Sequence, residues 1–273
     1  MRLDDYLRRV GVRGPLRPDA ETLRRLHVGH RETFPFENLT IQTGGTISLA
    51  RADLERKFLD EGRGGYCFEH NTLFAAALRD VGFTPSTLLA RVRHGTDPER
   101  RGRTHMLLRV PIESDVWIAD VGFGALSLVE PMRLADASRS NQLGITYVLR
   151  RDPAAPGPPL WVLSMQEASS AADLYEFSED PQTLADVEIA NHYTATHPAS
   201  IFRRTLTIQR ITRDERIILR GGTIVRYRDG VAVEEPVARA ELARVAREVM
   251  GIELPPGPFL CDAAPAAVPE TLG

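Results

Sequence analysis

The chain has 273 residues, of which 42% are hydrophobic and 26% charged, and this is typical of a globular protein able to bury a sizeable core. Its formal net charge is −3, so it lacks the basic excess of proteins that bind nucleic acid or anionic membranes. We therefore expect small molecules as its partners, with no nucleic acid and no membrane among them.

Apolar residues recur at helical spacing in four stretches of the first third of the chain. The first stretch begins at Leu3, and Asp19 and Ser48 stand where the N-caps of the second and third helices belong. The fourth begins at Cys67 and stops at Gly82, because glycine commonly ends a helix. Together these stretches predict a small helical bundle.

From Ser86 onward the apolar pattern becomes short and strand-like. Turn-rich pieces such as 94–98 and 152–159 separate the runs. Several short strands in succession predict an antiparallel sheet or barrel. The expected strands cover residues 86–92, 104–110, 115–121, 145–150, 160–166 and 174–177.

The last third of the chain mixes helices with strands. Helices are expected over 184–193 and over 238–250. Asp229-Gly230 is a hairpin signal between the last two strands, and the segment after Pro256 is expected to be a loosely held tail. The strands expected in this region cover residues 206–212, 216–219, 223–227 and 231–233.

The cysteines and the N-terminus indicate the compartment. Two cysteines, Cys67 and Cys261, are too few for a disulfide framework, which fits a reducing environment. The first residues carry acids where a signal peptide has a basic stretch and an apolar core. No apolar run approaches the roughly 18 residues that a membrane span needs. We expect a cytoplasmic protein.

The segment Arg63-Gly64-Gly65-Tyr66-Cys67-Phe68-Glu69-His70-Asn71 places a cysteine between a glycine turn and the start of a predicted helix. The partial positive charge of a helix N-terminus lowers the pKa of a thiol, and the thiolate is the reactive form. Glycines allow a tight turn and the close approach of a substrate. Cys67 is therefore a candidate nucleophile, although the local pattern also fits an ordinary buried cysteine.

Of the seven histidines, His105 is the best candidate for the base that such a nucleophile needs. It begins a strand that a turn over 111–114 joins to a second strand ending near Asp120. If paired residues have numbers that sum to about 225, His105 lies level with Asp120. The aspartate would then keep one ring nitrogen protonated and leave the other facing the thiol. The alternative is that Asp120 merely begins the turn over 121–124.

Two rival chemistries lack the residues that they require. Cys67 and His70 have the spacing of half a zinc site, but no second pair completes four ligands. The glycine-rich pieces 62–65 and 221–222 match neither pattern of a phosphate-binding loop. We expect no metal.

Six motifs follow one another along the chain: Pro35-Phe36-Glu37-Asn38-Leu39, residues 63–71, 104–105, 120–124, 174–177 with Pro181-Gln182, and 191–198. Together they resemble the arylamine N-acetyltransferases, in family order from about residue 6 to 250. The resemblance implies an α+β fold. Its parts are an N-terminal helical bundle over 1–85, a central antiparallel β-barrel over 86–182, and a connecting helix with an α/β lid over 183–254, followed by a tail over 255–273.

For the chemistry, the resemblance implies a catalytic triad of Cys67, His105 and Asp120. Acetyl-CoA would acetylate Cys67 in a first step, and an arylamine or arylhydrazine nitrogen would take the acetyl group in a second, which is a ping-pong mechanism. By family position, Phe36, Phe123 and Phe202 would line the slot for the acceptor ring.

The resemblance also places Thr104 and Gly124 near the CoA channel. His192 departs from the family, whose members usually carry an aromatic residue there, and Ala125 stands where a second glycine is frequent. Two further readings stay open. One is an amide synthase that closes an ansamycin-type macrolactam with the same triad, and the other is a non-catalytic binding protein of the same fold. Whether the chain is a monomer or a small homo-oligomer also stays open.

Overall fold

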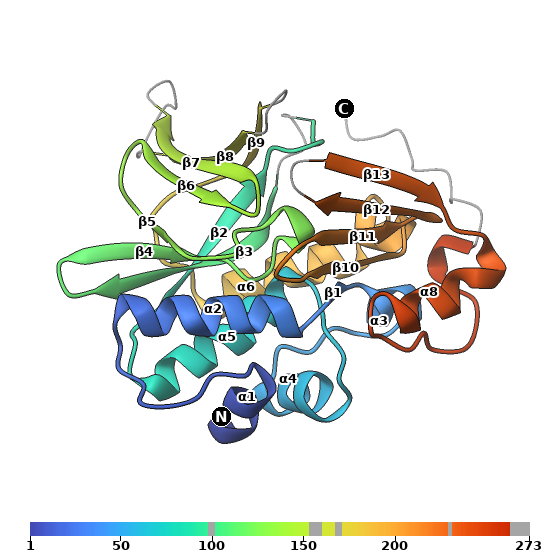
Figure 1. Ribbon diagram of the computed structural model, residues 1–273, viewed down its shortest axis with the longest axis horizontal. Coiled ribbons are helices and arrows are strands. Elements are labelled where there is room, and N and C mark those ends of the chain that lie inside the picture. The colour runs from blue at the N-terminus through green and yellow to red at the C-terminus, as the bar shows by residue number, and fades with distance from the viewer. Residues whose placement is uncertain (98–101, 153–159, 167–170, 229–230, 263–273) are drawn as a thin grey trace.

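Two antiparallel sheets lie side by side above a layer of helices in the computed structural model (Figure 1). The structure describes residues 1–97, 102–152, 160–166, 171–228 and 231–262. The helical layer comes from the first third of the chain, as the sequence predicted. Its helices are α1 (Leu3–Arg9), α2 (Ala20–Thr33), α3 (Leu39–Gln42), α4 (Arg51–Glu55) and α5 (Cys67–Val81), with a π-helical turn over Arg56–Asp60 after α4.

The predicted starts at Asp19 and Cys67 and the predicted stop at Gly82 are confirmed, and the predicted cap at Ser48 is wrong. Asp19 caps α2, because its side chain accepts the N–H of Thr22, and α5 ends at Gly82, whose φ is +108°. Ser48 does not cap α4, which begins after Ala50. The hydroxyl of Ser48 instead accepts the N–H of Ala50 in a local turn, so the helix starts later than predicted.

An eight-stranded sheet, in the order β5-β4-β3-β2-β9-β8-β7-β6, forms the nearly closed barrel. Every strand predicted between Ser86 and Phe177 is present. The sequence missed two short strands, one of which reads Ser-Arg-Ser-Asn-Gln and has no apolar alternation. The strands are β2 (Ser86–Val92), β3 (Arg103–Ile112), β4 (Asp115–Ala119), β5 (Met132–Arg133), β6 (Ser138–Gln142), β7 (Ile145–Asp152), β8 (Leu160–Gln166) and β9 (Ala171–Phe177).

The register of β3 on β4 differs from the predicted one by two residues. Leu108 pairs with Ala119, so paired numbers sum to 227 and not to about 225. The reason is a tighter turn than expected, in which Glu113 takes a left-handed φ of +53°. Because side chains alternate with a period of two, this shift keeps His105 and Asp120 on the faces that the prediction gave them.

The second sheet has five strands in the order β1-β10-β11-β12-β13, and the orange and brown arrows of Figure 1 show most of it. Helix α6 (Leu184–Thr196) and the short α7 (Ile201–Arg204) connect the two sheets. The final predicted helix is shorter than expected, with a 3₁₀ turn over Arg239–Glu241 before α8 (Leu242–Glu248). The hairpin expected at Asp229-Gly230 lies outside the described residues. The strands are β1 (Phe36–Glu37), β10 (Thr207–Ile211), β11 (Arg216–Arg220), β12 (Thr223–Arg228) and β13 (Val231–Pro236).

The segment after Pro256 is held more firmly than the sequence predicted, at least as far as Asp262. Phe259 is buried in a cluster with α8 and β10, and the N–H of Cys261 donates to Oε1 of Gln42 at 3.0 Å. The domain limits at residues 85, 182 and 254 stay predictions.

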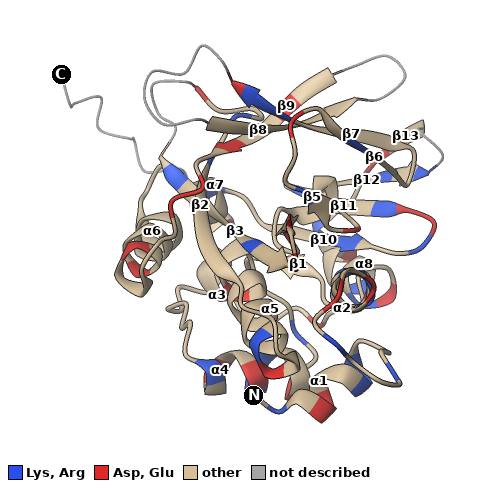
Figure 2. Ribbon diagram, turned by 90° about the vertical axis from the view of Figure 1, so that its left-hand side faces the viewer, with Lys and Arg blue, Asp and Glu red and all other residues tan. Residues whose placement is uncertain are grey.

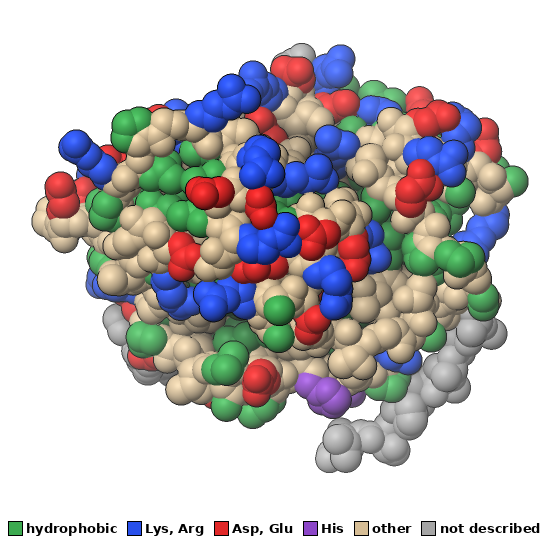
Figure 3. Space-filling view, turned by 90° about the horizontal axis from the view of Figure 1, so that it is seen from below, with side chains coloured by type: hydrophobic (Ala, Val, Ile, Leu, Met, Phe, Trp, Pro, Cys, Tyr) green, Lys and Arg blue, Asp and Glu red, His purple; other side chains and the backbone are tan. Residues whose placement is uncertain are grey.

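Basic and acidic side chains alternate over the surface. Figure 2 shows the two signs interspersed along the helices and strands of one side, and Figure 3 shows them mixed with hydrophobic side chains on another. Of the helices that the structure describes, none has an apolar stretch long enough to cross a membrane.

Candidate active site

The three predicted catalytic residues come together where α5 meets the end of β4. Cys67 is the first residue of α5, and its Sγ lies 3.8 Å from the carbonyl oxygen of Thr104. The N–H of Met106 points at the same sulfur. The sulfur therefore contacts the peptide groups on both sides of His105. Nε2 of His105 lies 2.8 Å from Oδ2 of Asp120, and both side chains are buried.

The end of β4 leaves room for α5 at this place. Met106 pairs with Leu89 of β2 on one side. The pairing of β3 with β4 begins only at Leu108, so the other edge of Met106 faces α5. Asn71, one helical turn after Cys67, donates from Nδ2 to the carbonyl of Met106 at 2.7 Å. A local break in the sheet thus positions Cys67.

Asn71 is a site residue that the sequence analysis did not single out. Its Nδ2 also donates to Oδ1 of Asp120 at 3.2 Å, and its Oδ1 accepts the N–H of Val121 at 3.2 Å. The buried amide therefore ties together the three segments that hold Cys67, His105 and Asp120. Its position four residues after Cys67, on the same helix face, was the available signal.

Asp120 is held in its ionised form. Burial acts to raise the pKa of this carboxyl, but the attraction and hydrogen bond of His105 outweigh it. The N–H of Gly122, which donates to Oδ1 at 2.9 Å, and the amide of Asn71 act in the same direction, and the pKa falls to about 2. The carboxylate must accept, so Nε2 of His105 carries a proton and Nδ1 is the nitrogen left for Cys67.

The thiol of Cys67 departs from the expectation that its place on α5 alone would lower its pKa. Burial raises the pKa of Cys67 well above its ordinary value, and the N–H groups of Met106 and Phe68 oppose this only in part. A thiolate at this position therefore needs a cation beside it.

Gly122 allows the loop after β4 to reach Cys67. A Cβ on Gly122 would lie 2.8 Å from Cα of Cys67 and 2.6 Å from Nδ2 of Asn71. Contacts this short are not tolerated, so only glycine fits here.

The three predicted acceptor-slot rings fall into two places. The ring of Phe123 lies edge-on to His105 with centroids 4.9 Å apart, so this residue is next to the histidine. The rings of Phe36 and Phe202 pack together with their centroids 5.9 Å apart. The ring centroid of Phe202 lies 5.4 Å from that of Tyr66, the residue before Cys67. Tyr175, which the predicted slot did not include, packs on both His105 and Phe123 at 5.0 Å.

Thr104 and Gly124, the two residues expected near the CoA channel, have different surroundings: Thr104 contacts the sulfur, and Gly124 is packed inside a loop. The carbonyl of Thr104 contacts the sulfur, as described above. Gly124 is buried with a φ of +79°, and a Cβ there would lie 2.5 Å from Oε1 of Gln209. Loop packing alone therefore demands this glycine. Ala125 is also buried, and its N–H donates to the same oxygen at 2.7 Å.

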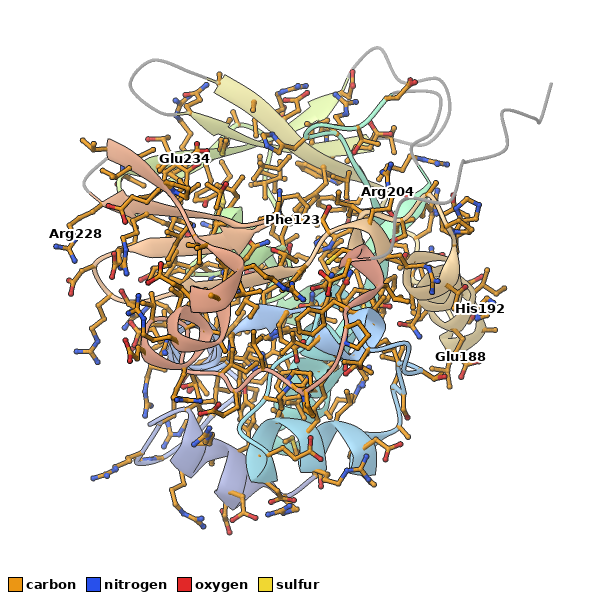
Figure 4. The ribbon with its side chains drawn as sticks, turned by 90° about the vertical axis from the view of Figure 1, so that its right-hand side faces the viewer. Phe123, Glu188, His192, Arg204, Arg228 and Glu234 are labelled. Carbon is orange, nitrogen blue, oxygen red and sulfur yellow. The ribbon has the colours of Figure 1, made fainter. Side chains whose placement is uncertain are left out.

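His192 lies far from these residues. Figure 4 shows His192 and Glu188 at the outer edge of α6, apart from Phe123 near the middle of the view. His192 and Glu188 border a shallow surface hollow of about 710 Å³, and none of the three predicted catalytic residues lines this hollow. The departure from the family at His192 therefore concerns an outer helix face.

A buried ion cluster supports the start of α5 and was not predicted. Glu69 accepts the N–H of Tyr66 at 3.1 Å in a capping box, and Nζ of Lys57 lies 2.7 Å from its other oxygen. Glu37 accepts from Arg63 at 2.8 Å in the same cluster. Lys57 is the only lysine of the chain, and this was the one feature of the sequence that set it apart.

His70 is engaged by protein groups rather than free for a metal. Its Nε2 donates to the carbonyl of Pro35 at 3.1 Å, and its Nδ1 lies 2.9 Å from Nε2 of His30. The described part of the chain holds no group of three or more His, Cys, Asp or Glu placed to bind a metal ion.

Known proteins resemble this chain over most of its length. The family model described as N-acetyltransferase matches residues 19–258. The arylamine N-acetyltransferase / N-hydroxyarylamine O-acetyltransferase of Salmonella typhimurium is 38% identical over 220 residues, 80% of this chain and 76% of that protein. The arylamine N-acetyltransferase of Escherichia coli is 35% identical over 235 residues, 85% of this chain and 82% of that protein.

Solved structures show the same fold. The arylamine N-acetyltransferase of Nocardia farcinica superposes with a TM-score of 0.88 at 36% identity, covering 93% of this chain and 90% of that one. That of Mycobacterium marinum in complex with CoA superposes with a TM-score of 0.85 at 28% identity, covering 92% of each. The predicted α+β fold is confirmed, and the protein is an acyltransferase. Within that class, the chain belongs to the arylamine N-acetyltransferase family.

Proposed function

We propose that this enzyme transfers the acetyl group of acetyl-CoA to the nitrogen of an arylamine or arylhydrazine through an acetyl-Cys67 intermediate. The observation that carries the proposal is the 2.8 Å His105–Asp120 pair beside the sulfur at the start of α5. The names of the relatives support the acceptor class, and the CoA complex of the Mycobacterium marinum protein supports the donor.

In the first step, the sulfur of Cys67 attacks the carbonyl carbon of the acetyl thioester. An isolated thiolate is costly in this buried position, so the reactive form is an ion pair in which His105 holds the proton. The carbon–sulfur bond to CoA then breaks, and CoA leaves as a thiol with the proton of His105. Asp120 keeps the ring oriented throughout.

In the second step, the neutral nitrogen of the acceptor attacks the carbonyl carbon of acetyl-Cys67. His105, now neutral, takes the proton that the nitrogen loses. The bond to Sγ breaks, the amide leaves, and the thiolate–imidazolium pair is restored. One thioester is exchanged for another before the amide forms, so each step has a modest barrier.

The site offers donors for the negative oxygen that forms in both steps. The N–H groups of Phe68 and Met106 point at the sulfur. We assign them to the carbonyl oxygen of the acetyl group that the sulfur holds, because donors fixed in advance stabilise such an oxyanion.

The acceptor ring and the donor thioester would contact different residues of the site. Phe123 is half-buried and lies against His105, so an aryl ring packed on it would bring its nitrogen to the acetyl group. Phe36 and Phe202 would close the slot on the side of Tyr66. The donor thioester would pass Thr104, with Gly124 behind it.

Steady-state kinetics test this proposal. Initial rates with acetyl-CoA and an arylamine, each varied at several fixed levels of the other, should give parallel double-reciprocal lines. Cys67→Ala should remove the activity, whereas Cys261→Ser should retain it. Intersecting lines, or turnover by Cys67→Ala, would contradict the covalent route. Transfer from long polyketide thioesters with none from acetyl-CoA would favour the macrolactam-forming reaction.

A further inference from the structure

Two arginines are buried beneath the loop that follows β4. Arg31, on α2, is 3% exposed and Arg216, on β11, is 1% exposed. Guanidinium groups are rarely buried so completely unless carboxylates pair with them, because removing a charge from water is costly. The burial of two charged arginines at this place therefore suggests that they have a role in the site.

Both arginines bind backbone carbonyls of the same loop. Nη1 of Arg31 donates to Val121 at 3.1 Å and Nη2 donates to Gly124 at 2.7 Å. Nη1 of Arg216 donates to the carbonyls of Ala125 and Ser127, the latter at 3.1 Å. The loop of residues 120–127, which holds Asp120 and Phe123, therefore rests on two cations.

Neither of these two guanidinium groups is paired with a carboxylate in the described part of the chain. Within the described residues, neither arginine has a carboxylate oxygen within 4 Å, and Nε of each lacks a hydrogen-bond partner. Arg216 completes its contacts with the carbonyl of Gln142 at 3.1 Å and with the ring of Tyr147. In a buried setting, charge that is not neutralised locally acts on other groups nearby.

Neutral side chains already hold other parts of this loop. Gln209 accepts the N–H of Ala125, and the hydroxyl of Tyr147 donates to the carbonyls of Leu126 and Ser127. Hydrogen bonding alone therefore does not require an arginine. Burial lowers the pKa of Arg31 to about 10, and the attraction of Asp120 opposes this, so Arg31 and Asp120 interact as charges.

We propose that Arg31 and Arg216 are positioning residues for acyl transfer. Both fix the 120–127 loop, and the charge of Arg31 favours the anionic forms of Asp120 and Cys67. This inference rests on the proposed function, since it presumes that Cys67 reacts as a thiolate.

Several other ionisable groups also influence the charge states of Cys67, Asp120 and Arg31. Glu69 and Asp120 act on Cys67, and both disfavour its thiolate. His105 and Tyr175 act on Asp120, and His27 accepts the N–H of Asp120 at 3.1 Å. Arg31 is a cation on α2 that attracts Asp120. Tyr66, beside Cys67, interacts with Cys67 and Glu69. The remaining groups that interact with Arg31 are Arg216, Tyr147, His27, His30 and His70.

The pH dependence of Cys67 alkylation tests the charge. In a Cys261→Ser background, the rate with iodoacetamide is measured against pH for the parent, Arg31→Met and Arg31→Lys. Loss of the cation should move the rise in rate to higher pH by about half a unit or more in Arg31→Met. Arg31→Lys keeps the charge but loses the fork, so its midpoint should stay near that of the parent. An unmoved midpoint in a folded Arg31→Met variant would overturn the role of the charge.

Two controls separate the possible failures. If the parent itself shows no alkylation below the ordinary thiol range, the proposed thiolate chemistry fails, whatever Arg31 does. If Arg31→Met does not fold, Arg31→Gln, which keeps amide donors for the carbonyls, gives the same readout. For Arg216, turnover should fall about tenfold or more in Arg216→Met and recover partly in Arg216→Lys. Unchanged turnover in folded Arg216→Met would remove it from the proposal.

Discussion

Nε2 of His105 lies 2.8 Å from Oδ2 of Asp120, although the two residues are not partners in the ladder between β3 and β4. Asp120 follows the last paired residue of β4, so its side chain bends back toward β3. Gly122 and Asn71 hold the carboxylate from its other side through Oδ1. The contact therefore depends on the loop after β4 as much as on the strand register.

Replacing Asp120 by asparagine tests the orienting role of this contact. Asparagine preserves the shape but can present its amide to Nε2, which leaves His105 in the wrong tautomer. We expect a fall in kcat of about 10³–10⁴-fold with a folded protein. Turnover at the parent rate, with unchanged circular dichroism, would reject the role of Asp120.

A methyl group on Gly122 should disturb the nucleophile directly. Its Cβ would lie 2.8 Å from Cα of Cys67, so the loop or the helix start must move. A displacement near 1 Å lowers activity by about 10²-fold. Gly102→Ala is the matched control, because its Cβ would lie 3.4 Å from a methyl group of Thr104. Equal rates in both variants would show that the close contact has no importance.

The amide of Asn71 should contribute to stability as well as to the site. Asn71→Ala leaves the carbonyl of Met106 and the N–H of Val121 without their partner, which costs about 1–3 kcal/mol of unfolding free energy for each unsatisfied buried group. Urea denaturation measures this loss. The exposed Asn141→Ala is the control and should change stability little. A small loss in Asn71→Ala would mean that water replaces the amide.

Stability should fall as the pH drops below about 6.5, because three buried histidines are neutral in the folded chain. Burial lowers the pKa of His27 to about 4 and that of His70 to about 3, and it also lowers that of His30. The unfolded chain binds protons at these residues below pH 6.5 and the folded chain does not.

At pH 5 each of these histidines therefore costs up to about 2 kcal/mol, from 1.36 kcal/mol per unit over 1.5 units. Asp120 does not oppose this loss, because the stability that it contributes is lost only below its ordinary pKa near 3.8. Urea midpoints at pH 7 and pH 5 measure the effect. His192→Asn, at an exposed position, should leave it unchanged. Equal midpoints at the two pH values would contradict the neutral state.

Much of this site could be predicted from the sequence, because its determinants are local. Helix α5 begins at Cys67 and ends before Gly82 as its glycines and apolar spacing indicate. The meeting of His105 with Asp120 also followed from a hairpin, even with the register two residues off. The spacing of Asn71 from Cys67 placed it on the same helix face, but the partners of Asn71 and Arg31 could not be predicted, since they are backbone atoms of segments far away in the chain.

Other misses have equally physical causes. Ser48 looked like an N-cap, but its hydroxyl was used in a local turn. The raised pKa of Cys67 reflects burial in the assembled core, which no local pattern reports. Residues 132–133 and 138–142 form strands because the barrel offers them partners, and not because their own side chains favour strands.

Intact-protein mass spectrometry after brief exposure to acetyl-CoA, without any acceptor, detects an acetyl-Cys67 intermediate if one forms. We expect one acetyl group per chain, located on Cys67 by peptide mapping, absent from Cys67→Ala and removed by addition of an arylamine. Formation of acetylated arylamine by a protein that never carries an acetyl group on Cys67 would contradict this expectation.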